Sequence, residues 1–244
     1  ETARPEPLGE GHHGWYRCRF RAAKPGARKL VFENVADSVT VFLNGDYVGQ
    51  SSTKRLTDGP RTAPHPTHFD LAVKAGDNVL AVLAKNWGCY RNASAYGVPR
   101  APGSGWGIVG RVLLDGPPGG RWRQRDGLSP ESTPLTWGPV KPAANPVRWF
   151  RISFPLRKQP AHLVVRASLK GLSQGVLWIN GHFAGLYSQT GTDAAVGYYL
   201  PSQWLRDQNE LIVLEEGGKQ PAEAEIRFDR AESYLPLRIA FTEQ

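Results

Sequence analysis

An internal duplication constrains this 244-residue chain more than any other feature of its sequence. Three landmarks recur in the same order and at a nearly constant separation: Gly14–Phe20 with Arg148–Phe154, Val41–Gly49 with Leu177–Gly185, and Asp77–Leu83 with Gln208–Leu214. Ordered recurrence of this kind indicates two copies of one structural unit. Each copy has about 100 residues of short apolar segments, which is the size of a β-sandwich.

The repeated segments have the character of β-strands. Large and charged residues alternate through Trp15–Phe20, and β-branched and aromatic residues fill Ser38–Leu43. Asn44-Gly45 and Asn180-Gly181 each lie between two such runs, which is typical of a tight β-hairpin. The 27 Gly and 20 Pro residues fall between short apolar runs, as they do when many strands are joined by turns.

We therefore predict an all-β chain of two tandem antiparallel β-sandwich domains. The first is expected at residues 1–116 and the second at residues 147–244. A segment rich in Pro, Gly and Arg, residues 117–146, is predicted as the linker between them. The apolar face of Val39, Val41 and Leu43 is expected to supply part of the first core, and that of Leu177 and Ile179 part of the second.

The net charge of +8 has its densest patch at Arg121, Arg123 and Arg125, at alternate positions. Nucleic-acid binding would require such a patch beside exposed aromatic residues. A solvated strand face or linker is the ordinary interpretation of such charges, and an acidic polysaccharide is a third. We expect no nucleic-acid partner. We also expect no membrane partner, because no run of about 18 apolar residues exists.

The N-terminal residues Glu1–Pro5 contain no apolar stretch of the kind that a signal peptide requires. Methionine is absent throughout, so we interpret the chain as a processed product or an excised piece. Secreted and cytoplasmic locations both stay open at this point.

Metal chemistry has little support in the sequence. Cys18 and Cys89 alone cannot build a zinc site, and we expect buried free thiols, with a disulfide as the alternative. Four aspartates offer oxygen ligands without forming a calcium-loop pattern: Asp37, Asp70, Asp77 and Asp193. We predict no obligatory metal and no other cofactor, and leave a structural calcium open.

Motifs in both copies resemble the C-terminal jelly-roll domains of family 35 β-galactosidases. In the second copy these are Trp178–Gly185, Tyr199–Leu205 and Asn209–Glu216, which resemble the last jelly roll of that family. The first copy is similar to the preceding jelly roll through Leu8–Glu10, Gly14–Arg17, Val41–Gly49, Asn78–Leu83, Asn86–Gly88 and Gly107–Val112. The resemblance covers nearly the whole chain and implies two jelly-roll, galactose-binding-like domains.

In that family, catalysis belongs to a TIM barrel that precedes these domains, and the present chain begins where such a barrel would end. A barrel needs about 250 residues and eight amphipathic helices, which this chain does not offer. A retaining glycosidase needs two carboxylates about 5 Å apart. The acidic residues here lie at strand ends and in turns, among them Glu215-Glu216 as the pair best placed to line a site. We predict no catalytic residues in this chain and leave its part in an enzyme open.

A sugar site requires aromatic faces and planar polar groups on exposed loops. In the first copy the candidates lie in the long insertion 86–107: Trp87, Tyr90, Arg91, Asn92, Tyr96 and Trp106. The alternative for Trp87 and Trp106 is that they close the end of the sandwich. In the second copy the candidates are Tyr187 and Tyr198, with packing against the sandwich as the alternative.

Three functions fit these observations. The first is a non-catalytic carbohydrate-binding accessory pair of a β-galactosidase-like glycoside hydrolase, with a β-galactoside-containing glycan as partner. The second is a structural fragment or subunit of a β-galactosidase that needs a separate TIM-barrel catalytic part. The third is an unrelated adhesion or interaction β-sandwich, which similarity of fold alone does not exclude.

Overall fold

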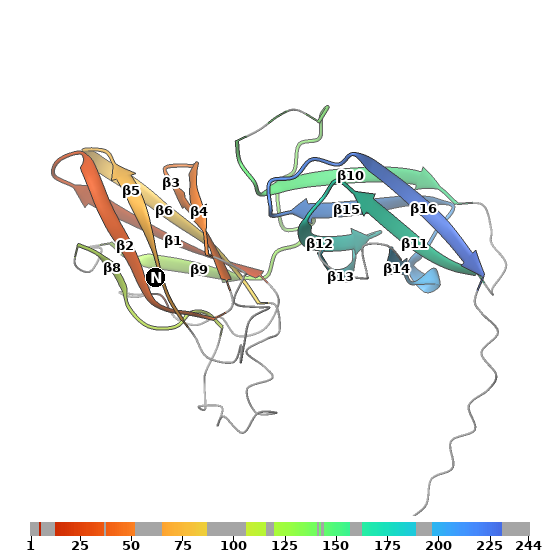
Figure 1. Cartoon of the computed structure of the whole chain (residues 1–244), viewed down its shortest axis with the longest axis horizontal. Coiled ribbons are helices and arrows are strands. Elements are labelled where there is room, and N and C mark those ends of the chain that lie inside the picture. The colour runs from red at the N-terminus through yellow and green to blue at the C-terminus, as the bar shows by residue number, and fades with distance from the viewer. Residues whose placement is uncertain are drawn as a thin grey trace, which may run out of the picture. The chain divides into compact units, whose positions relative to one another are not determined.

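The computed structural model describes Pro5 and residues 13–36, 38–51, 65–86, 106–115, 120–140, 142, 144–156, 163–188 and 197–230. The chain divides into two compact units, Glu1–Ser132 and Thr133–Gln244, each with its own core (Figure 1). Every strand pairing among the described residues is antiparallel. The predicted all-β, antiparallel sandwich class is therefore confirmed.

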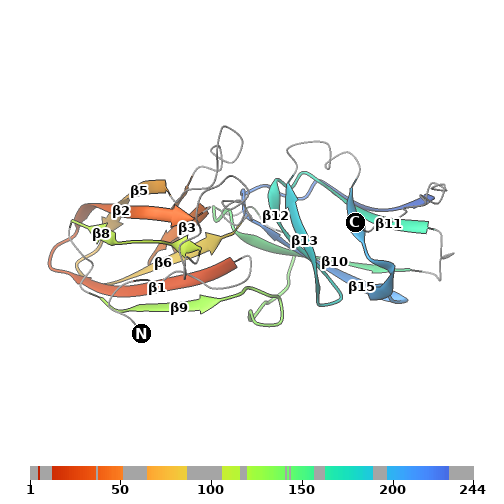
Figure 2. The ribbon, with the colours of Figure 1, turned by 90° about the horizontal axis from the view of Figure 1, so that it is seen from below.

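The first unit contains nine strands: β1 (His13–Ala22), β2 (Gly26–Ala36), β3 (Ser38–Leu43), β4 (Asp46–Gln50), β5 (His65–Val73), β6 (Gly76–Lys85), β7 (Gly107–Ile108), β8 (Val112–Leu114) and β9 (Trp122–Asp126). One sheet has the order β4-β3-β6-β1-β9. The other has the order β5-β2-β7, with β8 also paired to β2. Figure 2 shows the two layers, with β1 and β9 in one and β2 and β8 in the other.

Strand β9 lies inside the segment that the sequence predicted as linker. Trp122–Asp126 pairs with β1 and forms the edge of the first sheet, with Arg17 opposite Arg123. Trp122 is buried in the core of this unit, where its ring meets that of Tyr16 edge-on. The physical reason is that a buried tryptophan and an available strand edge hold these residues, in spite of their arginines.

The alternation of side chains along each strand produces the first core. Tyr16, Cys18 and Phe20 of β1 point inward, as the predicted face of Val39, Val41 and Leu43 does. Cys18 is a free thiol, and burial raises its pKa to about 11. It is therefore protonated and unreactive at neutral pH. Cys89 lies outside the described residues.

The second unit contains seven strands and one short 3₁₀ helix: β10 (Arg148–Pro155), β11 (Leu163–Lys170), β12 (Gln174–Ile179), β13 (His182–Ser188), β14 (Tyr198–Leu200), η3 (Ser202–Trp204), β15 (Gln208–Glu215) and β16 (Glu223–Arg230). One sheet has the order β10-β15-β12-β13 and the other β14-β11-β16. Leu177 and Ile179 belong to the core between them, as predicted.

The sequence duplication reappears in strand order. The order β13-β12-β15-β10 of the second unit repeats the order β4-β3-β6-β1 of the first. Both β3–β4 and β12–β13 carry a register shift at equivalent points, Val41/Phe42 and Leu177/Trp178. A shared pairing order together with a shared bulge shows that the two copies fold on one plan.

An asparagine pair ties each hairpin to the neighbouring strand. Asn44 has a φ of 55° and Asn180 a φ of 49°, in the left-handed region that asparagine tolerates. The Asn44 amide donates to Asn78 Oδ1 at 3.1 Å and accepts from the Val79 N–H at 2.9 Å. The second unit repeats this, with Asn180 donating to Asn209 Oδ1 at 2.9 Å and accepting from the Glu210 N–H.

Replacing Asn209 by alanine is expected to destabilise the second unit by about 2–3 kcal/mol, because this buried side chain makes three part-buried hydrogen bonds that alanine cannot make. Its partners are the backbone N–H and carbonyl of Arg206 and the amide of Asn180. Urea unfolding of the full chain measures the change. The control is Asn145→Ala, which removes one acceptor from an exposed turn. Equal urea midpoints for the two variants would contradict the structural role of the asparagine pair.

Candidate functional site

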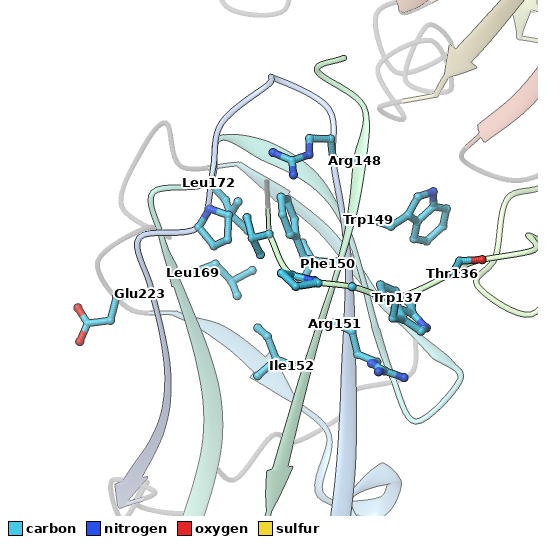
Figure 3. Close-up of a pocket in the computed structure, with 15 residues that line it drawn as sticks. Thr136, Trp137, Arg148, Trp149, Phe150, Arg151, Ile152, Leu169, Leu172 and Glu223 are labelled. Atoms are coloured by element: carbon cyan, nitrogen blue, oxygen red, sulfur yellow. The ribbon is translucent and has the colours of Figure 1, made fainter. Parts of the chain in front are cut away.

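A pocket of about 450 Å³ lies in the second unit, where β10 faces the second sheet. Strand β10 is the edge of one sheet, and β16 is an edge of the other. The floor is apolar and consists of core residues of both sheets and of the turn between β11 and β12: Phe150, Leu169, Leu172 and Val213. Figure 3 shows Phe150 and Ile152 of β10 pointing toward Leu169 and Leu172. The pocket is therefore the open side of the sandwich, reaching down to its core.

The segment before β10 forms the outer wall of this pocket. Trp137, Gly138, Pro139 and Val140 line it without belonging to any strand. Trp137 lies beside Arg151, whose guanidinium is 4.9 Å from the centre of the indole ring (Figure 3). Contact with a cation holds the flat ring in place, so the wall is an oriented aromatic surface.

Two arginines and one carboxylate supply polar groups around the apolar floor. Arg148 lies 5.0 Å from the centre of the Phe150 ring, and Arg151 pairs with Glu210 at 3.6 Å. Glu223 is bound to Lys170 at 3.0 Å on the exposed rim. Glu223 is the one carboxylate among the described lining residues, so these residues contain no pair of carboxylates for glycoside hydrolysis. The arrangement suits recognition of a ligand that has an apolar face and hydroxyl groups.

The sequence of β10 explains why one strand serves both the core and the pocket. Phe150 and Ile152 face the core, whereas Trp149 and Arg151 face outward. Trp149 packs on Trp178 of β12 with the ring centres 5.3 Å apart. Alternation in an edge strand thus places an aromatic residue and an arginine next to the segment that carries Trp137.

Tyr187, a predicted sugar-binding residue, is buried instead, with 1% of its surface exposed. Its hydroxyl donates to Glu215 Oε2 at 2.6 Å, and its ring packs edge-on against Tyr198. Glu215 also accepts hydrogen bonds from the Ser173 hydroxyl, the Ser173 N–H at 3.0 Å and the Gly217 N–H at 2.9 Å. The Glu215 carboxylate, fully buried, is thus satisfied by protein donors and holds the end of β15 in place.

Tyr198, the other candidate of this unit, is half-buried. Its hydroxyl donates to the Ser188 carbonyl at 2.7 Å and lies 3.2 Å from the Ser188 N–H. It therefore ties β13 to β14. Tyr187 and Tyr198 lie together, but neither lines the pocket beside Trp137.

Of the candidates in the first unit, five lie outside the described residues: Trp87, Tyr90, Arg91, Asn92 and Tyr96. Trp106 is described and has 3% of its surface exposed, as a member of the first core. This agrees with the alternative interpretation, in which Trp106 packs into the sandwich, and leaves its ring no open face for a sugar.

Sequence reasoning missed Trp137, the residue that forms the pocket wall. It lies in the predicted linker, in the sequence Thr136-Trp137-Gly138-Pro139. A large aromatic residue within a polar, Pro- and Gly-rich segment was the available signal, because such a residue must pack on something or bind something. The position of the pocket itself depends on which strand ends each sheet.

Among the described residues, no group of three or more His, Cys, Asp and Glu side chains is arranged to hold a metal ion. In the same part of the chain, no helix is long and apolar enough to span a membrane.

Burial raises the pKa of Tyr187 well above its usual range, and the negative charge of Glu215 adds to this effect. The folded protein therefore keeps this proton to a higher pH than the unfolded chain. The contribution to stability is complete below the unfolded pKa of about 10, and is lost as the pH rises further.

We expect Tyr187→Phe to lessen the fall in the free energy of unfolding above about pH 10, by up to about 1.4 kcal/mol per pH unit. Urea unfolding at a series of alkaline pH values measures this slope. Tyr199→Phe, at a side chain that is 49% exposed, is the control and should keep the slope of the unmodified chain. If Tyr187→Phe kept that same slope, the raised pKa of Tyr187 would not be a cause of the loss of stability at alkaline pH.

Comparison with known proteins gives a family match within the second unit. Residues 147–210 match the family model described as "Beta-galactosidase, galactose-binding domain". A β-galactosidase of Photobacterium profundum is 33% identical over 79 residues, which is 30% of this chain and 7% of that protein. The chain thus spans a small part of that relative. Residues 147–210 are similar to a galactose-binding-like domain of glycosidases.

Solved structures of sugar-active proteins are similar only at a low level. A Pleurotus ostreatus lectin in complex with GalNAc has 16% identity and a TM-score of 0.31, over 93% of this chain and 76% of that one. A family 78 rhamnosidase of Bacillus sp. GL1 has 14% identity and a TM-score of 0.33, over 96% of this chain and 34% of that one. Similarity at this level transfers no function to the present chain.

Proposed function

We propose that this chain is a non-catalytic carbohydrate-binding accessory part of a β-galactosidase-like glycoside hydrolase. One observation carries the proposal. Residues 147–210, which match the galactose-binding domain, include all of β10 together with Leu169 and Leu172, and these line the pocket beside Trp137. The part of the chain that resembles a sugar-binding domain thus supplies the floor and one strand of this pocket.

The chemistry of the pocket supports a sugar as its ligand. A hexose has apolar C–H faces that stack on aromatic rings and hydroxyls that bind planar polar groups. Trp137 offers the first, and Arg148 and Arg151 offer the second. The volume of about 450 Å³ falls in the usual range for small-ligand sites. Only a few contacts are present to offset the free-energy cost of association. We therefore expect a dissociation constant in the micromolar to millimolar range.

A β-galactoside-containing glycan is the proposed ligand, and family 35 is the proposed origin of the parent enzyme. Both rest on the motifs quoted above together with the match over residues 147–210. Turnover would then need a TIM-barrel catalytic part that carries the two carboxylates. Both units would have a jelly-roll, galactose-binding-like fold in this proposal, and Trp87, Tyr90, Arg91, Asn92 and Tyr96 of the first stay predicted sugar-binding residues.

We expect Trp137→Ala to weaken binding of methyl β-galactoside and of a galactan oligosaccharide by about fivefold to tenfold, since a stacked aromatic surface is lost. Isothermal titration of the full chain measures the dissociation constants. Tyr199→Ala is the matched control, because it removes an exposed aromatic residue of the same unit outside the pocket. It should leave the constants unchanged.

The same preparations should not hydrolyse a nitrophenyl β-galactoside. Hydrolysis by the purified chain would refute a non-catalytic role. A folded chain that binds neither ligand at millimolar concentration would favour the structural alternative, in which these units serve only to complete an enzyme. Equal dissociation constants for Trp137→Ala and Tyr199→Ala would show that Trp137 does not belong to the sugar site.

A further inference from the structure

The outer face of the five-stranded sheet in the first unit carries a cluster of arginines. Arg17 and Arg19 of β1, with Arg121 and Arg123 at β9, line a hollow of about 210 Å³. We call these four residues the arginine face. Arg17 lies directly opposite Arg123 in the register, and all four side chains are exposed. Like charges directly opposite on neighbouring strands are destabilising.

No carboxylate is found among the described residues that line the hollow, which are arginines alone. Within the described part of the chain, Arg17, Arg19 and Arg121 form no ion pair. The nearest described acidic position on β6 is Asp77, which lies opposite Arg21 at the far end of β1. Four positive charges are therefore gathered around one hollow.

Three other arginines of this protein each have an acidic partner. Arg28 pairs with Asp115 at 3.3 Å, Arg111 with Glu33 at 2.6 Å and Arg227 with Glu225 at 2.9 Å. Arg111 also holds the pKa of Glu33 below its usual range through hydrogen bonds. These three arginines each have an acid beside them, whereas the described residues that line the hollow include no carboxylate.

Aromatic residues lie on the same face of the same sheet. The register places Arg123, Arg17, Ala81, Phe42 and Tyr47 in one row across the five strands. Phe42 contacts Trp15 and Tyr47 with ring centres 5.9 and 6.0 Å apart, and Tyr47 is 39% exposed. One end of the row is cationic and the other is aromatic.

We propose that this face binds an anionic polysaccharide, whose carboxylate or sulfate groups occupy the arginine face while sugar rings lie toward Tyr47. Arginines at alternate strand positions are spaced by about 6.8 Å, which suits acidic groups repeated along a chain. Guanidinium groups form paired hydrogen bonds with carboxylates and sulfates. A second hollow of about 460 Å³ adjoins Arg19 along the sheet, and Asp77 lines it together with Arg21.

A glycan fits this face better than a nucleic acid does. Single-stranded nucleic acids bind by stacking successive bases on exposed rings next to cationic groups. Phe42 is buried at 7% exposure, which leaves Tyr47 as the exposed ring of the row, three strands away from Arg17. The site is also separate from the pocket beside Trp137, so each can fail without the other.

The test compares two double variants of the full chain that lose the same charge. R17T/R123T removes the centre of the arginine face and keeps strand-forming residues. K29T/K74T removes two exposed lysines that lie on, or directly after, strands of the other sheet. The probes are polygalacturonate, a sulfated glycosaminoglycan, neutral galactan and a single-stranded DNA oligonucleotide, each titrated at low and at physiological salt. Thermal melts confirm that both variants fold.

We expect polygalacturonate or the glycosaminoglycan to bind the unmodified chain more tightly than galactan does, with an affinity that falls as salt rises. R17T/R123T should weaken this binding at least about tenfold, and K29T/K74T less than about twofold. Equal losses of affinity in the two variants would show that binding depends on net charge alone, and would overturn the proposal. Tighter binding of DNA, lost in R17T/R123T, would overturn it in favour of nucleic acid. Loss of galactoside binding in the Trp137→Ala variant tests the pocket beside Trp137 and leaves the arginine face untouched.

Discussion

The hydrogen bonds between paired asparagines hold both units in register, and the surfaces described above depend on that register. Asn44 and Asn180 each occupy a hairpin turn and reach across to the strand that pairs with it. Their partners Asn78 and Asn209 are buried and bind the backbone of the preceding turn. A slip of one residue would turn each strand over and bring its outer residues into the core. The rows of arginine and aromatic residues exist because that slip is prevented.

One scaffold used twice has produced two different outer faces. Trp15, Phe42 and Tyr47 of the first unit correspond to Trp149, Trp178 and Phe183 of the second, with the same ring contacts. The charges differ. Arg151 pairs with Glu210, whereas the position equivalent to Glu210 in the first unit is Val79. With valine in place of glutamate at this position, the β6 residues paired with Arg17 and Arg19 include no carboxylate. This difference between the two units leaves the charges of the arginine face unbalanced by β6.

The sequence could predict what depends on short-range pattern. Ordered landmarks, alternation and the Asn-Gly turns were enough for the strands, the hairpins and part of each core. The partners Asn78 and Asn209 could not be assigned, because each lies some 30 residues from the asparagine it binds. Strand β9 was taken for linker because three arginines in five residues hide the single buried Trp122. The candidates in 87–96 remain predictions, and Trp106 and Tyr187 are core residues in the structure.

The edges of the two duplicated sheets explain why the pocket lies in one unit and the arginine face in the other. In the first unit, β9 covers the outer edge of β1 and brings Arg121 and Arg123 beside Arg17 and Arg19. In the second unit, no described strand pairs with the corresponding edge of β10, and the segment with Trp137 passes there instead. An added strand extends the charged outer face of the sheet, whereas an uncovered edge leaves access to the apolar interior. The same duplicated sheet therefore presents a surface suited to a long acidic chain in one copy and a pocket suited to a small sugar in the other.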